Sequence, residues 1–216
     1  MVPKTKSKRG MGRGRGRPRP GDAPDPAHVA RIAFTAFAIA GYDGASVREI
    51  AATAAVDPAL VARRYGSKLG LWKATVDELA ERMASMYDAI AQLESDPAPF
   101  LSRFQRVLRL FTDFCCEVPE LGRFFTNEIA EPGDRRDYVL EQIWRPSFAV
   151  MQPWMRKAQA MGLIRAKDAD ILVFQLIGMV AMPLMMTSVM EKELGLDDDQ
   201  IRLRLGQSVE RLLLGA

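Results

Sequence analysis

Apolar residues recur at helical spacing through residues 46–72, in the pattern of two short helices joined by a tight turn. One helical face is apolar at the i, i+3, i+4 and i+7 positions, which are Val47, Ile50, Ala51 and Ala54. Ser46 stands where an N-cap belongs, and Glu49 completes a capping box. Asp57 is a second N-cap, followed by Pro58 at the first helical position, where its missing N–H costs nothing. The pattern predicts a helix-turn-helix whose second helix, about eight residues and roughly 12 Å long, matches a DNA major groove.

The rest of the chain also has the helical period, without strand-like alternation or an internal repeat. We expect a first helix over 27–40 that ends at Gly41, a long helix over 68–94, and further helices over 97–116 and 118–130. A longer helix over 134–162 contains Pro146 and Pro153, which should kink or divide it. Two last helices begin at Asp168 and Asp197. The sequence therefore predicts an all-α fold of about nine helices.

Residues 171–190 form an uncharged stretch of membrane-spanning length. Polar and helix-breaking residues dilute it, namely Gln175, Gly178, Pro183, Thr187 and Ser188, and neither flank carries a basic cluster that would set an orientation. A helix that is apolar all round is also what a buried element between a core and a subunit partner looks like. We favour the buried helix and expect no membrane association.

The segments 41–51, GYDGASVREIA, and 56–68, VDPALVARRYGSK, resemble the DNA-binding domain of the tetracycline-repressor-like (TetR) family. The resemblance covers about residues 28–72 and is architectural beyond them, in the number and length of the helices. The chain departs from the family pattern at Leu60, which is often Thr, at Ala62, commonly an aromatic residue on the DNA backbone, and at Leu69-Gly70, which replaces an acidic pair. The resemblance implies a helix-turn-helix domain over 27–72 and a larger helical domain over 73–216 for effector binding and dimerisation, after an arm over 1–26.

Residues expected on double-stranded DNA follow from the same pattern. Arg63 should contact a base edge or a phosphate, and Arg48 on the preceding helix is the second candidate. Phosphate contacts, which position a protein without specifying sequence, are expected from Ser46, Arg64, Tyr65 and Lys68. The outward positions of the recognition helix complete the set, and these are Pro58, Ala59, Leu60 and Ala62.

The net charge of +3 is unevenly distributed. Residues 1–26 contain eight Lys and Arg against two Asp, a balance of +6, which leaves −3 for the other 190 residues. Rich in Gly and Pro, this arm has little to bury and should be disordered in isolation. Its segment 14–20, GRGRPRP, resembles a minor-groove AT-hook formed by Arg15, Gly16, Arg17, Pro18 and Arg19. The alternative is a polybasic tail that senses only phosphates.

The composition and the motifs offer little support for an enzyme. There is one histidine, His28, and the adjacent Cys115 and Cys116 cannot form a disulfide framework, which suits a reducing, cytoplasmic location. The sequence has no Cys/His metal spacing, no G-x-S-x-G and no phosphate-binding loop, and the G-x-G-x-G of residues 12–16 follows no strand. We therefore predict no catalytic residues, no metal and no cofactor.

The middle of the chain is rich in aromatic residues, any one of which a plain core would explain. The family resemblance implies a small-molecule pocket there, and eight residues have the spacing to face a common cavity: Phe104, Leu108, Phe111, Trp144, Phe148, Met151, Phe174 and Met182. Few internal cations are available to hold an anion, with Arg145 as the exception, so we expect an apolar or amphipathic effector.

The last helix carries an apolar face of Ile201, Leu205, Val209 and Leu212. In the resembled family the final two helices of each subunit pack as a four-helix bundle, which implies a homodimer on a near-palindromic operator and a repressor that its effector releases. Two other classes remain open. One is an architectural DNA-binding protein that uses the arm and the helix-turn-helix without a ligand, and the other is an enzyme.

Overall fold

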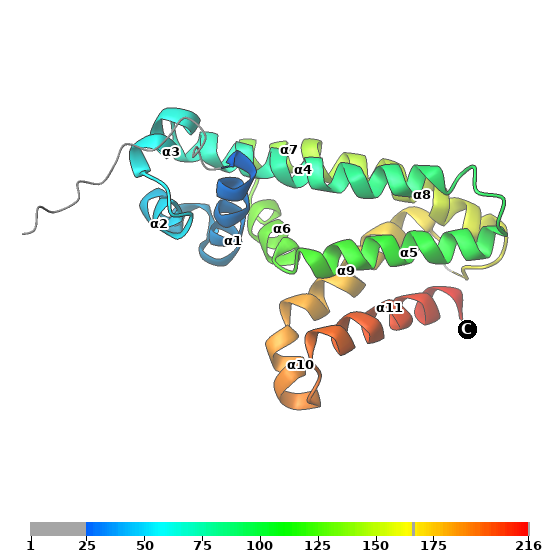
Figure 1. Cartoon of the computed structure of the whole chain (residues 1–216). Coiled ribbons are helices and arrows are strands. Elements are labelled where there is room, and N and C mark those ends of the chain that lie inside the picture. The colour runs from blue at the N-terminus through cyan, green and yellow to red at the C-terminus, as the bar shows by residue number, and fades with distance from the viewer. Residues whose placement is uncertain (1–24, 166, 216) are drawn as a thin grey trace, which may run out of the picture.

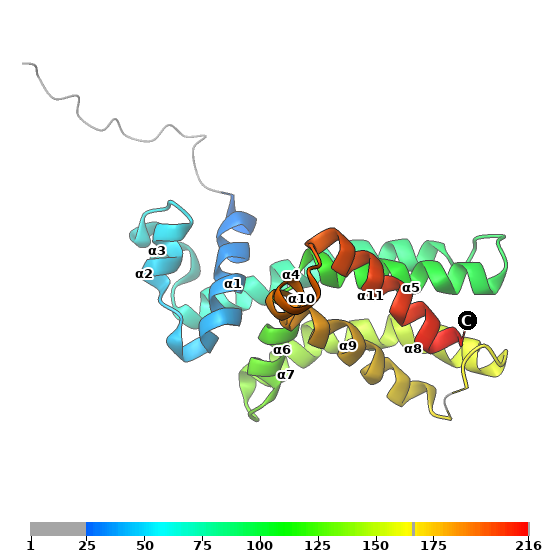
Figure 2. The ribbon, with the colours of Figure 1, turned by 90° about the horizontal axis from the view of Figure 1, so that it is seen from below.

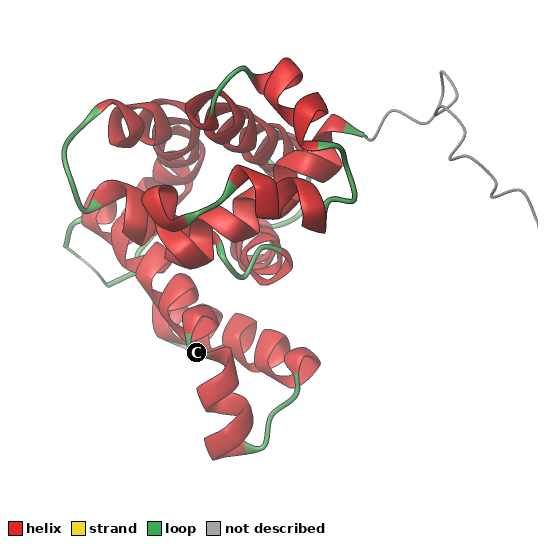
Figure 3. Ribbon diagram, turned by 90° about the vertical axis from the view of Figure 1, so that its left-hand side faces the viewer, coloured by secondary structure: helices red, strands yellow, loops and turns green. Residues whose placement is uncertain are grey.

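The computed structural model describes residues 25–165 and 167–215, and all regular structure in these ranges is helical (Figures 1 and 3). The α-helices are α1 (Pro26–Gly44), α2 (Val47–Thr53), α3 (Pro58–Tyr65), α4 (Lys68–Gln92), α5 (Phe100–Glu117), α6 (Leu121–Ile129), α7 (Asp134–Val139), α8 (Arg145–Ala160), α9 (Ala169–Met185), α10 (Thr187–Leu194) and α11 (Asp198–Leu214). A π-helical segment, Leu140–Trp144, joins α7 to α8. The predicted all-α class is confirmed, although several predicted helices are divided.

Helices α1 to α3 form one end of the molecule, and α4 runs from this end alongside α5 towards the other (Figure 1). α1 packs against α4 and α6, α8 packs against α9, and α11 packs against α5 (Figure 2). Buried residues of the N-terminal end, such as Phe37 and Trp72, belong to the same hydrophobic cluster as Leu176 of α9 and Val209 of α11. The predicted boundary after residue 72 lies inside α4, so one continuous helix joins the two predicted domains.

Helix α1 continues for one turn past its predicted end at Gly41. Gly41 has φ 69° and ψ 172°, a conformation that L-residues with a side chain rarely adopt. The helical path breaks at this residue, resumes, and ends where the Ala45 N–H donates to the Gly41 carbonyl at 3.2 Å. The break sets the direction in which the chain enters α2.

The two prolines of the predicted helix 134–162 behave differently. Pro146 lies in the first turn of α8, directly after the π-helical segment. A first turn is where a missing N–H costs least, so the chain restarts its α-helix at this proline. Pro153 lies inside α8 without ending it.

The uncharged stretch 171–190 is divided between α9 and α10, which meet at an angle of 63°. In the part of the chain that the structure describes, no single helix is long and apolar enough to cross a membrane. The bent pair α9 and α10 reaches the required length and composition only when both helices are counted together.

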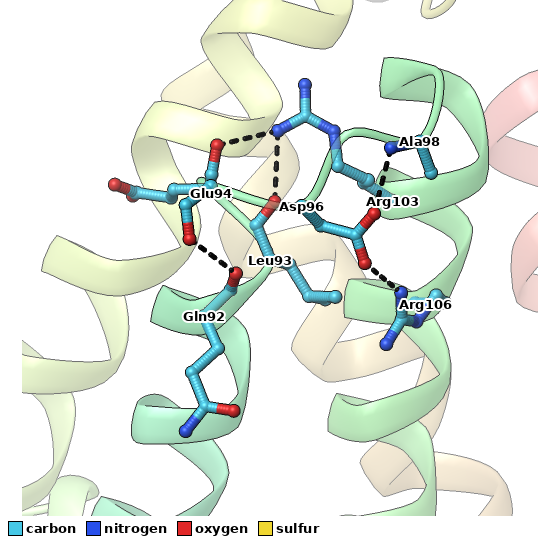
Figure 4. A network of polar contacts seen from close by, with 8 residues as sticks. Gln92, Leu93, Glu94, Asp96, Ala98, Arg103 and Arg106 are labelled. Carbon is cyan, nitrogen blue, oxygen red and sulfur yellow. Dashed lines mark hydrogen bonds and ion pairs between the residues drawn. The ribbon is translucent and has the colours of Figure 1, made fainter.

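Arg103 closes the turn between α4 and α5 (Figure 4). Its Nη1 donates to the carbonyl oxygens of Leu93 and Glu94, both at 2.9 Å, and so satisfies acceptors at the end of α4. The guanidinium also lies 5.8 Å from the ring centre of Phe100 and 6.0 Å from that of Trp154. One side chain therefore joins α4, α5 and α8 at the end of the molecule far from α2 and α3.

Replacement of Arg103 tests how much its contacts between α4, α5 and α8 stabilise the fold. We expect Arg103→Leu to lower the free energy of unfolding by about 1.5–3 kcal/mol, because two carbonyls lose a charged donor. Arg106→Leu is the matched control, since Arg106 lies three residues further along α5 in an exposed ion pair with Asp96 at 2.5 Å and should matter less. Urea denaturation of both variants measures the difference, and equal losses would contradict the assignment.

Candidate nucleic-acid interface and ligand cavity

Local capping builds the two helices of the helix-turn-helix. Ser46 Oγ accepts the Glu49 N–H at 3.4 Å at the start of α2, and Asp57 Oδ1 accepts the Ala59 N–H at 2.8 Å at the start of α3. The reciprocal bond of the predicted capping box, from Glu49 back to Ser46, is not among the hydrogen bonds of the described residues. In the connecting turn Ala55 has φ 55°, a left-handed conformation that reverses the chain direction.

Helix α3 is anchored by one residue and exposed over most of its surface. Val61 is 2% exposed and fixes the helix against the core. The side chains expected to face DNA lie outward, with Pro58, Ala59, Ala62, Arg63 and Arg64 exposed and Leu60 half-buried. The described residues provide Arg63 with no ion pair, so its guanidinium can reach a ligand outside the chain.

Two of the predicted phosphate contacts also hold the domain together. Lys68 Nζ donates to the Asp43 carbonyl at 3.0 Å and lies 5.0 Å from the ring centre of Tyr42. The Tyr65 hydroxyl donates to the Pro26 carbonyl at 3.4 Å. Both side chains are half-buried, whereas Arg48 on α2 is exposed. The roles of these residues on DNA stay predictions.

Gly70, which departs from the family pattern, has a steric reason in this chain. A Cβ at this position would lie 2.0 Å from the carbonyl oxygen of Tyr65. The end of α3 therefore approaches the start of α4 so closely that only glycine fits. The residues of the hook-like segment, Arg15 to Arg19, lie outside the described residues.

An apolar cavity of about 50 Å³ lies behind this domain, among α4, α5, α6, α8 and α9. Phe111, Phe125, Trp144 and Ile177 form much of its wall. Its polar lining includes Ser147, which shares a 2.5 Å hydrogen bond with the Tyr87 hydroxyl and donates to the Ile143 carbonyl at 2.6 Å.

Burial controls the ionisation of the groups at the cavity. Desolvation raises the pKa of Tyr87 to about 12, against the opposing hydrogen bond from Ser147. It also raises the pKa of Cys115, which lines the cavity, to about 12. Both groups are neutral at physiological pH, so the cavity suits an uncharged part of a ligand, and the Cys115 thiol is not in its reactive form.

A wider groove of about 660 Å³ adjoins the cavity, and both are lined by Pro119 and Leu184. The groove lies between the end of α1, α6 and the α10–α11 region. Its charged lining residues are Glu120, Arg123, Asp198, Asp199 and Arg202. Arg202 is already paired with Asp113 at 3.0 Å and Glu117 at 3.6 Å, which leaves the groove with an excess of carboxylates.

Comparisons with known proteins agree with the helix-turn-helix geometry. Residues 31–75 match the family model described as bacterial regulatory proteins, tetR family. The match places the DNA-binding domain of this chain in the TetR family. The chain is a DNA-binding transcriptional regulator, and this family is not enzymatic. A comparison with curated protein sequences finds no match.

Solved structures share the fold of this TetR-family chain at low sequence identity. FadR from Bacillus subtilis in complex with stearoyl-CoA aligns with a TM-score of 0.63 and 16% identity, over 87% of this chain and 96% of that one. AibR in complex with isovaleryl coenzyme A and operator DNA aligns with a TM-score of 0.63 and 17% identity, over 88% and 98%. HlyIIR, a hemolysin II transcriptional regulator, aligns with a TM-score of 0.64 and 18% identity, over 88% and 96%.

The single cavity predicted for eight residues is not formed in the described structure. Phe111 and Trp144 line the apolar cavity. Phe104, Leu108 and Met151 are at most 2% exposed and belong to the core, while Phe174 and Met182 are 52% and 58% exposed. Phe148 packs on the rings of Trp144 and Phe174, 6.1 and 6.0 Å away. Arg145, the cation considered for an anion, is exposed and paired with Glu141.

Sequence reasoning missed the contribution of α6 to the cavity. Leu121, Gly122 and Phe125 line it from this helix. A Cβ on Gly122 would lie 3.0 Å from the Cβ of Ala181, so α6 and α9 are in close contact at the edge of the cavity. The four-residue spacing of Leu121 and Phe125 is a signal of an apolar helical face that the sequence analysis did not use, and it does not show which helices that face meets.

Arg63 is the sharpest test of the nucleic-acid interface. If its guanidinium makes a bidentate hydrogen bond to a guanine, Arg63→Ala should weaken the free energy of operator binding by about 1–3 kcal/mol. The variant should also lose the base preference at one base pair per half-site. Arg64→Ala, one residue along, removes the same charge and should weaken all sequences alike. Affinities for the operator, for single-base variants and for random DNA measure both effects. Equal losses on operator and random DNA would reduce Arg63 to a phosphate contact.

Proposed function

We propose that this TetR-family regulator is a homodimeric repressor that leaves a near-palindromic operator when a small apolar or amphipathic effector enters the cavity. The observation that carries the proposal is the position of α6 between the cavity and the DNA-binding end. One face of α6 lines the cavity through Leu121 and Phe125. Its other face packs on α1, with the Phe124 ring 4.9 Å from that of Phe34 and Asn127 Nδ2 donating to the Ala38 carbonyl at 2.9 Å.

Unpartnered apolar surface on α9 and α10 supports the homodimer. Ile171, Phe174, Met182 and Met185 recur at helical spacing along α9 and are 42–58% exposed. α10 has no buried residue, and it carries Val189 and Leu194, 45% and 62% exposed. An eight-residue helix that buries none of its residues within its own chain is marginal in water, so a second copy that covers this surface would account for its stability.

The apolar face predicted on the last helix divides in the structure, because Leu205 is buried within its own chain and Leu212 is exposed. Leu205 is 9% exposed and packs inside its own chain, as does Leu213, while Leu212 is 71% exposed. The buried residues of α11 follow one another at intervals of four, and each interval turns the buried stripe about 40° around the helix. At the end of α11 the buried position is therefore Leu213 and not Leu212. Aspartate at Leu205 would therefore damage the subunit itself.

A substitution on α9 tests the dimer. We expect Met182→Asp to yield folded monomers that lose operator binding, because a carboxylate would be buried in the contact between subunits. Met161→Asp is the control, since Met161 at the end of α8 is similarly exposed, at 55% against 58%. Sedimentation velocity and operator binding are measured for both. A Met182→Asp protein that stays dimeric would contradict this interface.

The volume of the cavity indicates how an effector acts. Sites for small molecules usually enclose about 300–1,000 Å³, whereas this cavity has about 50 Å³. An effector must therefore displace some of the wall, and α6 is one of the wall helices that also contact α1. A ligand that binds the displaced state better than the closed one shifts the protein towards it, and this differential affinity accounts for release from DNA.

The charges that line the groove indicate which head group the effector carries. The complexes of FadR and AibR contain stearoyl-CoA and isovaleryl coenzyme A, and the apolar cavity of this chain suits the acyl part of such ligands. Carboxylates outnumber free cations in the adjoining groove, where only Arg123 lacks an ion pair among the described residues. Phosphates of a coenzyme A group would be repelled there, so we propose an effector with an apolar tail and an uncharged head.

Matched amphiphiles test this proposal. Dodecanol should raise the melting temperature and weaken operator binding, and lauroyl-CoA, with the same chain, should do so less. Ile177→Trp should fill the cavity and abolish the response while operator binding persists, and Met161→Trp on the exposed end of α8 is the control. Stabilisation by anionic metabolites alone would contradict the proposal. A ligand-independent protein without a discrete footprint would support the architectural alternative.

A further inference from the structure

Glu128 is a buried carboxylate at the junction of the DNA-binding end with the rest of the chain. It is 3% exposed and lies on α6 one turn beyond Phe125, which lines the cavity. Its Oε1 accepts the indole N–H of Trp72 in α4 at 3.2 Å. Its Oε2 accepts from Arg135 Nε, one residue into α7, at 3.0 Å. A buried carboxylate needs such partners, because an unpaired charge in the interior is strongly unfavourable.

Arg135 reaches the DNA-binding end with its other surface. Its guanidinium lies 4.1 Å from the ring centre of Tyr42, well within the range of a cation–π contact. Tyr42 directly follows the break at Gly41 and leads into α2. Its ring also stacks on Phe37 and meets Trp72 edge-on, with ring centres 5.9 and 6.4 Å apart.

The residues Tyr42, Trp72, Glu128 and Arg135 form what we call the junction cluster, which joins α1, α4, α6 and α7. α2 contacts mainly α1 and α3, and α3 contacts mainly α2 and α4. Helices α2 and α3 are therefore connected to the rest of the chain through α1 and α4, and the junction cluster holds these two helices against α6 and α7. In a dimer, a small change of angle at each junction alters the separation between the two recognition helices.

We propose that Arg135 is a positioning residue for operator binding: held by Glu128 and packed on Tyr42, it sets the angle of the helix-turn-helix and so the half-site spacing that the dimer accepts. The inference rests on the proposed dimeric operator binding. It gives α7, which lies outside the helix-turn-helix, a role in operator binding. Two recognition helices on one face of DNA must lie about 34–36 Å apart. If the junction is looser, the distance between the two helices varies more. The dimer then discriminates less between the native half-site spacing and spacings that are one base pair longer or shorter.

The test compares operators whose half-sites are separated by the native spacing, or by one base pair more or fewer. For Arg135→Gln we expect affinity at the native spacing to fall about tenfold, with little change at the altered spacings, so that the spacing preference flattens. Arg136→Gln removes the same charge one residue along and should keep the preference, because among the described residues the ion pair of Arg136 is with its neighbour Asp137, at 3.4 Å. Arg135→Lys and Tyr42→Phe, which retain the cation and the ring, should keep most of it.

A second variant serves as the control for misfolding, because Arg135→Gln leaves the carboxylate of Glu128 buried without its cation. The double variant Glu128→Gln/Arg135→Gln removes both charges while an amide can still accept from Trp72, and it should fold and show the same flattened preference. An equal loss at every spacing would overturn the inference and leave the junction cluster a stabilising feature only. An unchanged preference in the double variant would also overturn it. A wild-type protein without any spacing preference would overturn the dimeric operator binding itself.

Discussion

The burial of Trp72 is the constraint on which the junction between the two ends of this protein depends. Its side chain is fully buried where α1, α4 and α6 meet. A buried indole N–H needs an acceptor, and Glu128 provides it from α6. The buried carboxylate in turn needs a cation, which is Arg135 of α7. Each of these requirements follows from the one before it, so a single aromatic side chain accounts for the polar contacts that connect α4, α6 and α7.

Helix α6 connects the cavity with the junction cluster along its length. Phe125 lies at the cavity and Glu128, three residues later, lies in the junction cluster. Because α6 is one continuous helix over this short distance, the proposed displacement of the cavity wall would also move Glu128 and its partners Trp72 and Arg135. The small volume of the cavity supports this proposal, because a ligand that exceeds about 50 Å³ requires some of the walls to move.

The distribution of apolar surface separates the two tasks of the protein. The interior of the chain is closed around one cluster that extends from α1 to α11. The apolar residues left exposed on α9 and α10 belong to helices that lie away from α2 and α3 (Figure 1). The surface that reads DNA is instead short, charged and anchored by Val61. In the proposed dimer, the contacts between subunits and the contacts with DNA therefore lie on different parts of the molecule, and the position of the first would set the geometry of the second.

Local chemistry determined the helix-turn-helix from the sequence alone. N-caps, a proline at the first helical position and the spacing of small apolar residues act within a few residues, so they predicted α2 and α3 and their outward side chains. The bend between α9 and α10 and the break before Pro146 were only partly visible, because a proline or a glycine can be accommodated or can end a helix according to its packing. The cavity was decided by tertiary structure. Phe104, Leu108 and Phe111 share one face of α5, yet only Phe111 reaches the cavity, because helical spacing fixes a direction but not the neighbour found there. Tyr42 is far from Glu128 and Arg135 in the sequence, and no local rule pairs the three residues. Only the packing of α6 and α7 against α1 and α4 brings the buried carboxylate, the guanidinium and the ring together.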